Sequence, residues 1–412
     1  MSALPPRSVL VVGAGAAGMM AALFAARAGA AVTVLETTRQ GGKKIVVSGG
    51  GRCNVLPSAV DARRFVTASS PRTLARILRA WPQPAQQRFF EHELGLPLAL
   101  EPGTGKLFPA SGRAADVRQA LLGAAQAAGA RFQMRCRVTR LEPEAHGWAA
   151  YLDGHAEALR ADAVVLATGG LSVPATGSEG FGLREAARLG HTVHPTYPAL
   201  TPLTAVPAPH AALAGVSLAA RLRAGAGREA AVACGGFLFT HRGYSGPAVL
   251  DVSHVAVRAR AAGAAPDVRV QWAGRDAAVW EEALRADGPG LVATTLRAHL
   301  PARLADALLA EAGLPPARTR AELRRDERRT LVRLLADYPL TTTGDEGYKK
   351  AEVTGGGVAL GEVDPRTMES RPRPGLFLCG ELLDAFGPIG GYNFFWAWST
   401  GRAAGLGAAR AT

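Results

Sequence analysis

The stretch SVLVVGAGAAGMMAALFAARAGAAVTVLE, residues 8–36, decides the fold of this chain. The apolar run at 8–12 predicts a short strand, and the alanine-rich run at 16–28 predicts a helix. A second apolar run at 31–35 predicts another strand, which ends at Glu36. This order of strand, glycine turn, helix and strand predicts a βαβ unit with parallel strands.

The glycines of this turn have the spacing GxGxxG that binds dinucleotides. Gly13 permits the tight turn, Gly15 lets the backbone approach a pyrophosphate, and Gly18 lets the helix pack closely on the strand. The helix N-terminus, with the amides of Ala16 and Ala17, then faces the phosphates. A glycine-rich turn of some other α/β fold is the alternative interpretation.

Glu36 narrows the choice of cofactor. It follows the first glycine at the distance where a carboxylate accepts hydrogen bonds from an adenosine ribose. An acidic residue there disfavours a 2′-phosphate, so FAD or NAD is favoured over NADP.

The order of elements further along favours FAD over NAD. A helix at 113–128 is followed by strand-like runs at 132–141, 148–152 and 163–167, and the last run ends in the turn ATGG. This is the order of FAD-binding domains of the glutathione-reductase type. Residues 40–54 contain too many glycines to predict a packed regular element.

The C-terminal stretch GLFLCGELLDAFGPIGGYNFFWAWSTG, residues 375–401, completes this pattern. It predicts a strand, the pair Gly380 and Glu381, a turn at Gly390 and Gly391, and a helix that begins near Asn393. In such a fold this return places an acidic residue on the ribityl chain. It also places a helix N-terminus, with the amides of residues 392–394, beside the flavin pyrimidine ring.

Composition excludes several classes of protein. The net charge of +13 invites a nucleic-acid interpretation, but only five of the 47 basic residues are lysine, and the arginines are interleaved with acidic residues. The basic balance therefore reflects composition more than a nucleic-acid surface. The four cysteines form no CxxC pair, and the histidines have no metal-ligand spacing, so no metal site is expected. Without a signal peptide or a membrane-spanning apolar run, we expect a soluble cytoplasmic protein with no membrane partner.

Changes of pattern along the chain predict a discontinuous FAD-binding domain. Its first part is 1–196 and its C-terminal part is 353–412. Short strands with Pro/Gly turns at 197–275 predict an inserted β-rich domain, and 276–337 predicts a small helical cap domain. Residues 338–352 return through the β-rich domain.

Several motifs resemble one known family, the BaiN/YhiN-like NAD(P)/FAD-dependent oxidoreductases, a group that also includes aminoacetone oxidase. The most specific motifs are GGKKIVVSGGGRCNV (41–55), GKLFPAS (105–111), TGSEGFGLREAARLGH (176–191), GGFLFTHRGYSGPAVLDVS (235–253) and AEVTGGGVAL (351–360). The family has Arg where this chain has Lys106. The resemblance implies an α/β fold with a Rossmann-like FAD-binding domain, an inserted β-rich domain and a small helical domain.

Pattern and resemblance together predict a set of residues that contact non-covalent FAD. They are Gly13, Gly15, Ala16, Ala17, Gly18, Glu36, Gly42, Lys43, Gly50, Gly51, Arg52, Cys53, Asn54, Thr168, Gly169, Gly170, Gly380, Glu381, Gly390, Gly391, Tyr392 and Asn393. The triplets 49–51 and 355–357 are interpreted as places where the backbone approaches the flavin ring. Lys43 and Arg52 are expected to direct charge toward the cofactor, whereas Lys44 is equally consistent with a solvated loop cation. A structural role is the alternative for Cys53.

The predicted activity is hydride transfer between flavin N5 and a small organic substrate held between the FAD-binding and β-rich domains. NAD(P)H or O2 would be the second redox partner, and NAD(P)H would bind without a fingerprint of its own. His241 and Tyr244 are candidates for a substrate pocket, with an ordinary β-turn as the alternative, and no residue is assigned to acid–base catalysis. Two other functions remain open: an RNA-binding flavoprotein such as a tRNA modification factor, and a FAD-binding protein without turnover.

Overall fold

The computed structural model describes residues 5–227, 230–285 and 290–410. The chain forms two compact units, each with its own buried core. Unit 1 consists of Met1–Thr196 and Val353–Thr412, and unit 2 consists of Tyr197–Glu352.

Unit 1 is built on a parallel sheet of five strands in the order β20-β10-β1-β2-β6. The bounds are β1 Ser8–Val12, β2 Ala31–Glu36, β6 Arg131–Met134, β10 Ala163–Leu166 and β20 Leu376–Leu378. Helix α1, Ala16–Arg27, connects β1 to β2, as the sequence predicts. The two strands that precede glycine turns, β1 and β10, lie side by side in the sheet, so their carboxyl ends and the turns meet at one edge.

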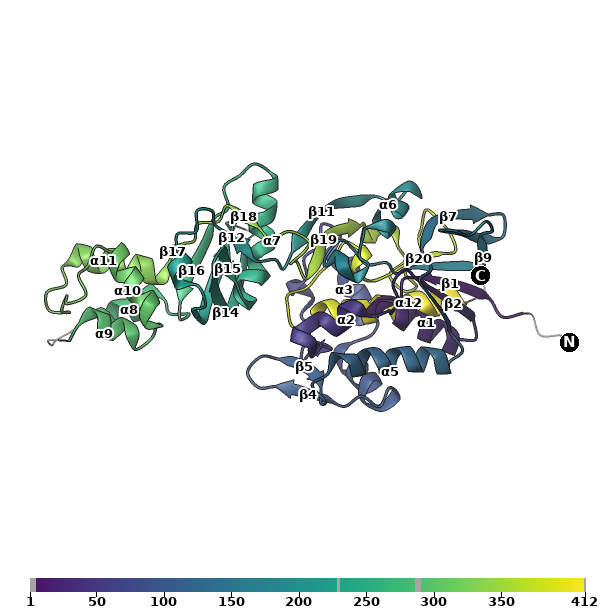
Figure 1. Cartoon of the computed structure of the whole chain (residues 1–412), viewed down its shortest axis with the longest axis horizontal. Helices are drawn as coiled ribbons and strands as arrows, with labels where there is room; N and C mark the ends of the chain where they lie inside the picture. The colour runs from purple at the N-terminus through teal and green to yellow at the C-terminus, as the bar shows by residue number, and fades with distance from the viewer. Residues whose placement is uncertain (1–4, 228–229, 286–289, 411–412) are drawn as a thin grey trace. The chain divides into compact units, whose positions relative to one another are not determined.

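The long C-terminal helix α12, Tyr392–Ala409, packs against α1 and against the sheet (Figure 1). Two glycines allow this close approach. A Cβ at Gly401 would lie 2.4 Å from the Ala17 carbonyl oxygen, and a Cβ at Gly405 would lie 2.2 Å from that of Ala21. The N-terminal and C-terminal parts of unit 1 therefore share one core.

Smaller elements surround this sheet. Helix α5, Ala114–Ala127, packs against α1, and an antiparallel meander precedes β10. The meander comprises β7 Val138–Glu144, β8 Gly147–Leu152 and β9 Leu159–Ala161. The remaining elements are α2 Lys43–Val47, β3 Leu56–Pro57, α3 Pro71–Arg79, α4 Gln83–Arg88, the π-helix Phe89–Glu93, β4 Leu98–Glu101, β5 Lys106–Pro109, α6 Phe181–Arg188, β11 Val193–Ala199 and β19 Val353–Val358.

Unit 2 contains an antiparallel sheet of seven strands in the order β17-β16-β13-β14-β15-β12-β18. The strands are β12 Leu203–Thr204, β13 Ser217–Ala224, β14 Ala231–Thr240, β15 Gly243–Ser245, β16 Val268–Trp272, β17 Tyr338–Pro339 and β18 Gly344–Asp345. The helices are α7 Pro247–Ala261, α8 Ala277–Leu284, α9 Val292–Arg297, α10 Ala302–Glu311 and α11 Arg325–Ala336. Trp272 of the sheet, Trp280 of α8 and Leu331 of α11 belong to one buried cluster, so these helices and the sheet share a core.

Three expectations about local structure are wrong. The run at 132–141 is two strands, because the backbone turns at Arg135, whose φ is +58°, and sends β6 and β7 into different sheets. Residues 40–54 do contain a regular element, the short helix α2. The region 197–275 holds a 15-residue helix, α7, whose buried face packs on β13 and β14.

No helix among the described residues is long and apolar enough to cross a membrane.

Candidate cofactor site

The glycine turn between β1 and α1 has room for a ligand at one position. A Cβ at Gly13 would lie 2.6 Å from the Ala167 carbonyl oxygen, and a Cβ at Gly18 would lie 1.9 Å from the Gly13 carbonyl oxygen. These two glycines are therefore required by packing of the chain on itself. A Cβ at Gly15 would meet no protein atom within 4 Å. The space beside Gly15 is left open.

Helix α1 begins at this open space without a side-chain cap. The amides of its first turn, which include those of Ala16 and Ala17, have no carbonyl partner within the helix. A phosphate group satisfies such amides and is stabilised by the helix dipole.

Glu36 lies at the end of β2 with its carboxylate fixed beside the turn. One carboxylate oxygen accepts a hydrogen bond from the Ala14 amide at 2.8 Å, and the other accepts from the Thr38 amide at 2.8 Å. Each oxygen keeps a lone pair for a further donor. The predicted bond to a ribose hydroxyl stays a prediction.

The glycine-rich segment after β2 reaches the same turn. The Gly42 amide donates to the Ala14 carbonyl oxygen at 2.7 Å, which attaches the start of α2 to the turn. Gly50 and Gly51 have φ values of +67° and +85°, and a Cβ at either would meet no protein atom within 4 Å. These two glycines therefore leave further open space beside the segment. The predicted contact residue Lys43 is half-buried in α2.

Arg52 and Cys53 have surroundings that differ from a cofactor contact. The Arg52 guanidinium lies 2.9 Å from a carboxylate oxygen of Glu101 and stacks on Phe108, so its charge already has a partner. Burial raises the pKa of the Cys53 thiol to about 12, which keeps it neutral at physiological pH. The expectation that Arg52 directs charge toward the cofactor stays a prediction, and the structural role for Cys53 is favoured.

Among the predicted FAD-binding residues that the structure describes, two buried side-chain atoms have no hydrogen-bond partner. They are the Asn54 Oδ1 atom and the Thr168 Oγ1 atom. Thr168 belongs to the turn after β10, and its Cα atom would lie 3.2 Å from a Cβ at Gly13. The Thr168 Oγ1 atom itself faces α6, because a Cβ at Gly182 would lie 2.1 Å from it. The fit to FAD therefore rests on the open space at Gly15 and on the uncapped amides of α1, which suit a pyrophosphate group.

A polar network that the sequence did not predict surrounds Glu381. The Lys44 ammonium donates to Glu381 Oε2 and to Ser172 Oγ, both at 2.7 Å. Glu381 Oε1 accepts from the Ser172 hydroxyl at 2.6 Å and from the Thr354 hydroxyl at 2.8 Å. Lys44 thus forms a partly buried ion pair with Glu381 and is not a solvated cation. Both oxygens of Glu381 are engaged by protein groups, and its role on the ribityl chain stays a prediction.

This network lies where three glycine-rich segments come together. A Cβ at Gly170 would lie 2.4 Å from the Thr354 Oγ1 atom and 2.9 Å from the Glu381 Oε1 atom. The triplet 355–357 serves the same kind of packing, because a Cβ at Gly356 would lie 2.2 Å from the Pro195 carbonyl oxygen. A Cβ at Gly357 would likewise lie 2.6 Å from the Leu382 carbonyl oxygen, so these two glycines are required by packing, and the approach of the triplet to the flavin stays a prediction. Ser172 and Thr354, each next to a glycine cluster, are the signal that could have revealed the network.

At the start of α12, the side chains of Tyr392 and Asn393 form hydrogen bonds within the protein, but no side chain caps the backbone amides. The Asn393 side chain donates to the Gly387 carbonyl oxygen and accepts from the Gly387 amide, both at 2.9 Å. The Tyr392 hydroxyl accepts from Arg64 at 2.9 Å and donates to the Ala59 carbonyl oxygen at 3.2 Å. No side chain caps the helix, so the first-turn amides remain available.

Three further glycines of the predicted set have different surroundings. Gly169 lies in the turn after β10 with a φ of +70°. Gly380 accepts a hydrogen bond from the Trp396 indole, which ties the end of β20 to α12. A Cβ at Gly390 would lie 3.3 Å from the Lys106 side chain. Lys106, conspicuous in the sequence only as a substitution for Arg, is therefore a neighbour of the α12 N-terminus.

The two pocket candidates of unit 2 have different environments. Tyr244 is 1% exposed, and its hydroxyl lies 2.9 Å from His210 Nδ1 in an aromatic core with Phe237 and Phe239. His241 is exposed in the turn between β14 and β15. The structure gives Tyr244 a packing role, and a substrate-binding role for His241 stays a prediction.

The family model described as "HI0933-like protein Rossmann domain" matches residues 7–407. The chain belongs to the HI0933-like family. This membership confirms the resemblance to BaiN/YhiN-like proteins and, with it, a Rossmann-type fold, FAD as cofactor and the class of FAD-dependent oxidoreductases.

Curated relatives of the HI0933-like chain carry two different names. It is 33% identical over 407 residues, or 97% of this chain and 98% of the relative, to the 3-dehydro-bile acid delta(4,6)-reductase of Clostridium scindens. It is 32% identical over 397 residues, or 95% of each chain, to the ribosomal RNA dihydrouridine synthase of Escherichia coli. Among solved structures, the 3-ketosteroid delta1-dehydrogenase of Sterolibacterium denitrificans has a similar fold, with a TM-score of 0.53, 14% identity, and coverage of 98% of this chain and 100% of that one.

Proposed function

We propose that this protein transfers a hydride between FAD and a carbon–carbon double bond conjugated to a carbonyl group, in the direction of reduction. The observation that carries the proposal is the open space at Gly15, enclosed by uncapped α1 amides and the fixed Glu36 carboxylate, which suits a dinucleotide. The relatives support the choice of substrate. A 3-dehydro-delta(4,6) bile acid contains a ketone conjugated to double bonds, and dihydrouridine forms by saturation of a uridine double bond conjugated to a carbonyl.

FAD, when bound, would supply hydride exchange at N5, and the protein would supply binding, orientation and electrostatics. The α1 amides and Glu36 would hold its phosphates and ribose. The α12 amides would stabilise negative charge on its pyrimidine edge. Reduction of the enone adds a hydride to its β-carbon and a proton to its α-carbon, the carbon bonded to the carbonyl group.

The test is an anaerobic half-reaction experiment on the FAD-loaded protein. We expect NADH or NADPH to bleach the flavin absorbance. We then expect a 4-ene-3-ketosteroid to restore the absorbance anaerobically, with a product heavier by two hydrogen atoms. Reoxidation by O2 alone, with the enone unchanged, would contradict the proposal and indicate an oxidase.

Reduction of uridine in RNA is a second candidate, favoured by the name of the Escherichia coli relative and by the net charge of +13. The arginine-rich segment 318–329 gives it little support. Arg318 and Arg324 both pair with Glu327 at 3.1 Å, and Arg328 pairs with Glu281 at 3.1 Å. Salt-sensitive binding of ribosomal RNA fragments, with flavin-dependent loss of uridine, would establish this candidate instead.

A further inference from the structure

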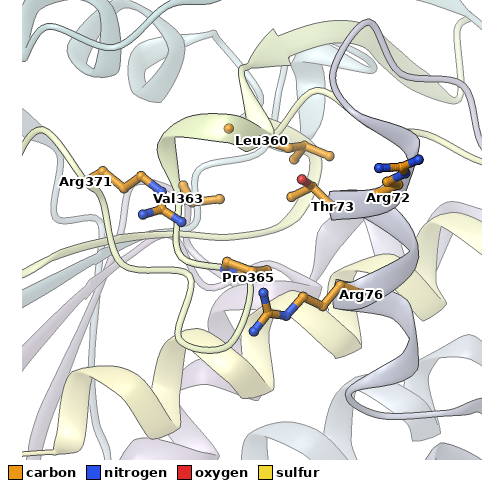
Figure 2. A pocket seen from close by; sticks show the side chains of 8 residues that line it. Arg72, Thr73, Arg76, Leu360, Val363, Pro365 and Arg371 are labelled. Atoms are coloured by element: carbon orange, nitrogen blue, oxygen red, sulfur yellow. The ribbon is translucent and has the colours of Figure 1, made fainter.

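Three arginines line one pocket in unit 1, and none of its lining residues belongs to the predicted FAD-binding set. Arg72 and Arg76 come from α3, and Arg371 comes from the segment that follows β19. Figure 2 shows the α3 side chains along one side of the pocket and Arg371 across from them. Helical residues four apart share a face, so α3 directs two positive charges to the same place.

These charges have no internal counterion. Among the described residues, no carboxylate forms an ion pair with any of the three guanidinium groups. The nearby acidic side chains have other partners: Glu362 accepts from His191 and from the Thr192 amide, and Asp364 accepts from the Arg366 amide. Many other surface arginines are paired, as Arg160 is with Glu144 and Arg297 is with Asp306. Like Arg79, the three arginines are exposed, so water screens their mutual repulsion, and an anion bound between them would lower it further.

The rest of the lining suits a small oxyanion. Thr73, in the first turn of α3, adds a hydroxyl group, and this turn contains no acidic residue. Pro365 and Val363 give the pocket a buried apolar wall. Guanidinium groups bind phosphate oxygens in pairs, and the first turn of a helix favours negative charge.

The size of the pocket limits the ligand. Its volume is about 210 Å³. Typical pockets for drug-sized ligands begin at about 300 Å³, so this pocket accommodates a compact group. A pyrophosphate group fits this size and charge, whereas an extended nucleic-acid backbone needs a long groove.

We propose that this pocket binds the phosphate or pyrophosphate group of a small phosphorylated compound. The site is separate from the FAD-binding residues and does not depend on the proposed reaction.

Calorimetric titration of the FAD-loaded protein with inorganic pyrophosphate, at low ionic strength in a phosphate-free buffer, tests the proposal. With the cofactor site filled, we expect saturable binding that weakens as salt is added. Arg76→Gln and Arg371→Gln should each weaken binding about tenfold, since each removes a charge-assisted contact. Arg79→Gln is the matched control, because Arg79 lies on the same helix, is exposed and does not line the pocket. It should retain affinity within about twofold.

Flavin absorbance and the thermal unfolding midpoint of each variant show whether it is folded and loaded, independently of turnover. The absence of pyrophosphate binding to the wild-type protein would overturn the proposal. Equal binding by all the variants would also overturn it. A parallel titration with a short single-stranded RNA tests whether the pocket binds nucleic acid instead. Arginine-dependent RNA binding without pyrophosphate binding would assign the pocket to a nucleic-acid surface and reject the compact ligand.

Discussion

At the scale of the residue, Gly13, Gly15 and Gly18 lie within one turn and have different neighbours. A side chain at Gly18 collides with the Gly13 carbonyl oxygen, whereas a side chain at Gly15 enters open space. The backbone of Gly15 has a φ of −79°, which alanine adopts without strain. Gly18 is therefore required for folding, whereas Gly15 is expected to be required for binding of the cofactor.

We expect Gly15→Ala to fold with stability close to that of the wild-type protein and to bind FAD at least tenfold more weakly, because its methyl group occupies the space beside the pyrophosphate. Gly18→Ala should lower the free energy of unfolding by about 2 kcal/mol or more, since α1 must move off its contact. Urea unfolding of the apo-proteins and fluorescence titration with FAD measure the two effects. Unchanged FAD affinity in Gly15→Ala would place the cofactor elsewhere.

Glu36 provides a second test at this scale. Glu36→Ala should weaken FAD binding by roughly 1.5–3 kcal/mol, the range for a hydrogen bond to a charged group. Glu36→Gln keeps one acceptor oxygen and should lose less. Because Glu36 also accepts the Ala14 and Thr38 amides, the stability of each apo-protein must be measured beside its FAD affinity. Loss of stability with FAD affinity intact would limit Glu36 to a structural role.

His254 couples the stability of unit 2 to pH. Burial in α7 lowers its pKa from 6.5 to about 4, with the nearby Arg258 charge acting in the same direction. The unfolded chain therefore binds a proton that the folded chain excludes, and stability falls as pH drops from about 6.5 toward 4. Between pH 7 and pH 5 this residue should cost about 2 kcal/mol of unfolding free energy. His254→Gln should remove that part of the loss in urea unfolding at the two pH values. An identical pH dependence in both proteins would contradict the assignment.

How far the residues could be predicted depends on how local their interactions are. The roles of Gly13 and Gly18 follow from their spacing, because the turn and the helix that they serve are adjacent in sequence. The pairing of Lys44 with Glu381 joins segments far apart in the chain and exists only when the glycine clusters pack together. Nothing in the immediate sequence of Lys44 distinguishes it from a solvated lysine.

At the scale of the element, α7 and α12 show which sequence features help and which hinder the prediction of a helix. Helix α7 follows Gly246 and begins with Pro247, a pair that is typical of turns but equally of a helix start. Helix α12 was predicted from its glycine turn. Its boundary at Gly391 has a reason other than flavin approach, because a Cβ there would lie 2.5 Å from the Leu56 carbonyl carbon in β3. Gly391→Val would disturb β3, so a different variant must test the helix N-terminus.

Asn393→Ala is that variant. It removes the side chain that holds both backbone groups of Gly387, and so loosens the loop that positions the first turn of α12. If the α12 amides stabilise the reduced flavin, the two-electron reduction potential should fall by about 30 mV, the equivalent of about 1.4 kcal/mol. A dye-coupled reduction assay on the FAD-loaded protein gives the potential. A potential equal to that of the wild-type protein, in a variant with a lower unfolding midpoint, would reduce the loop to a structural connection.

At the scale of the whole molecule, the two units have separate buried cores. The division of unit 2 into a β-rich domain and a helical cap stays a proposal. The sheet and the helices of unit 2 share one core, so they are not expected to fold independently. Deleting 276–337 would uncover Trp272 and its aromatic neighbours, so unit 2 should unfold rather than lose only a cap. Periodicity predicted the helices, but it could not indicate on which surface their apolar faces pack.

A cleaner division removes unit 2 entirely. All the predicted FAD contacts lie in unit 1, whose core joins the N-terminal βαβ unit to α12. The strands β11 and β19, where the chain leaves and re-enters unit 1, pair with each other, so a short Gly/Ser linker can join Thr196 to Val353. We expect this shortened chain to fold and to bind FAD non-covalently with an affinity within about tenfold of the full chain, because no core residue of unit 1 is removed. It should also lose enone reduction if unit 2 contributes to substrate binding. Flavin released by heat and identified by chromatography measures the first expectation, and the half-reaction assay measures the second. A folded but colourless unit 1, unable to take up added FAD, would show that unit 2 supplies part of the cofactor site.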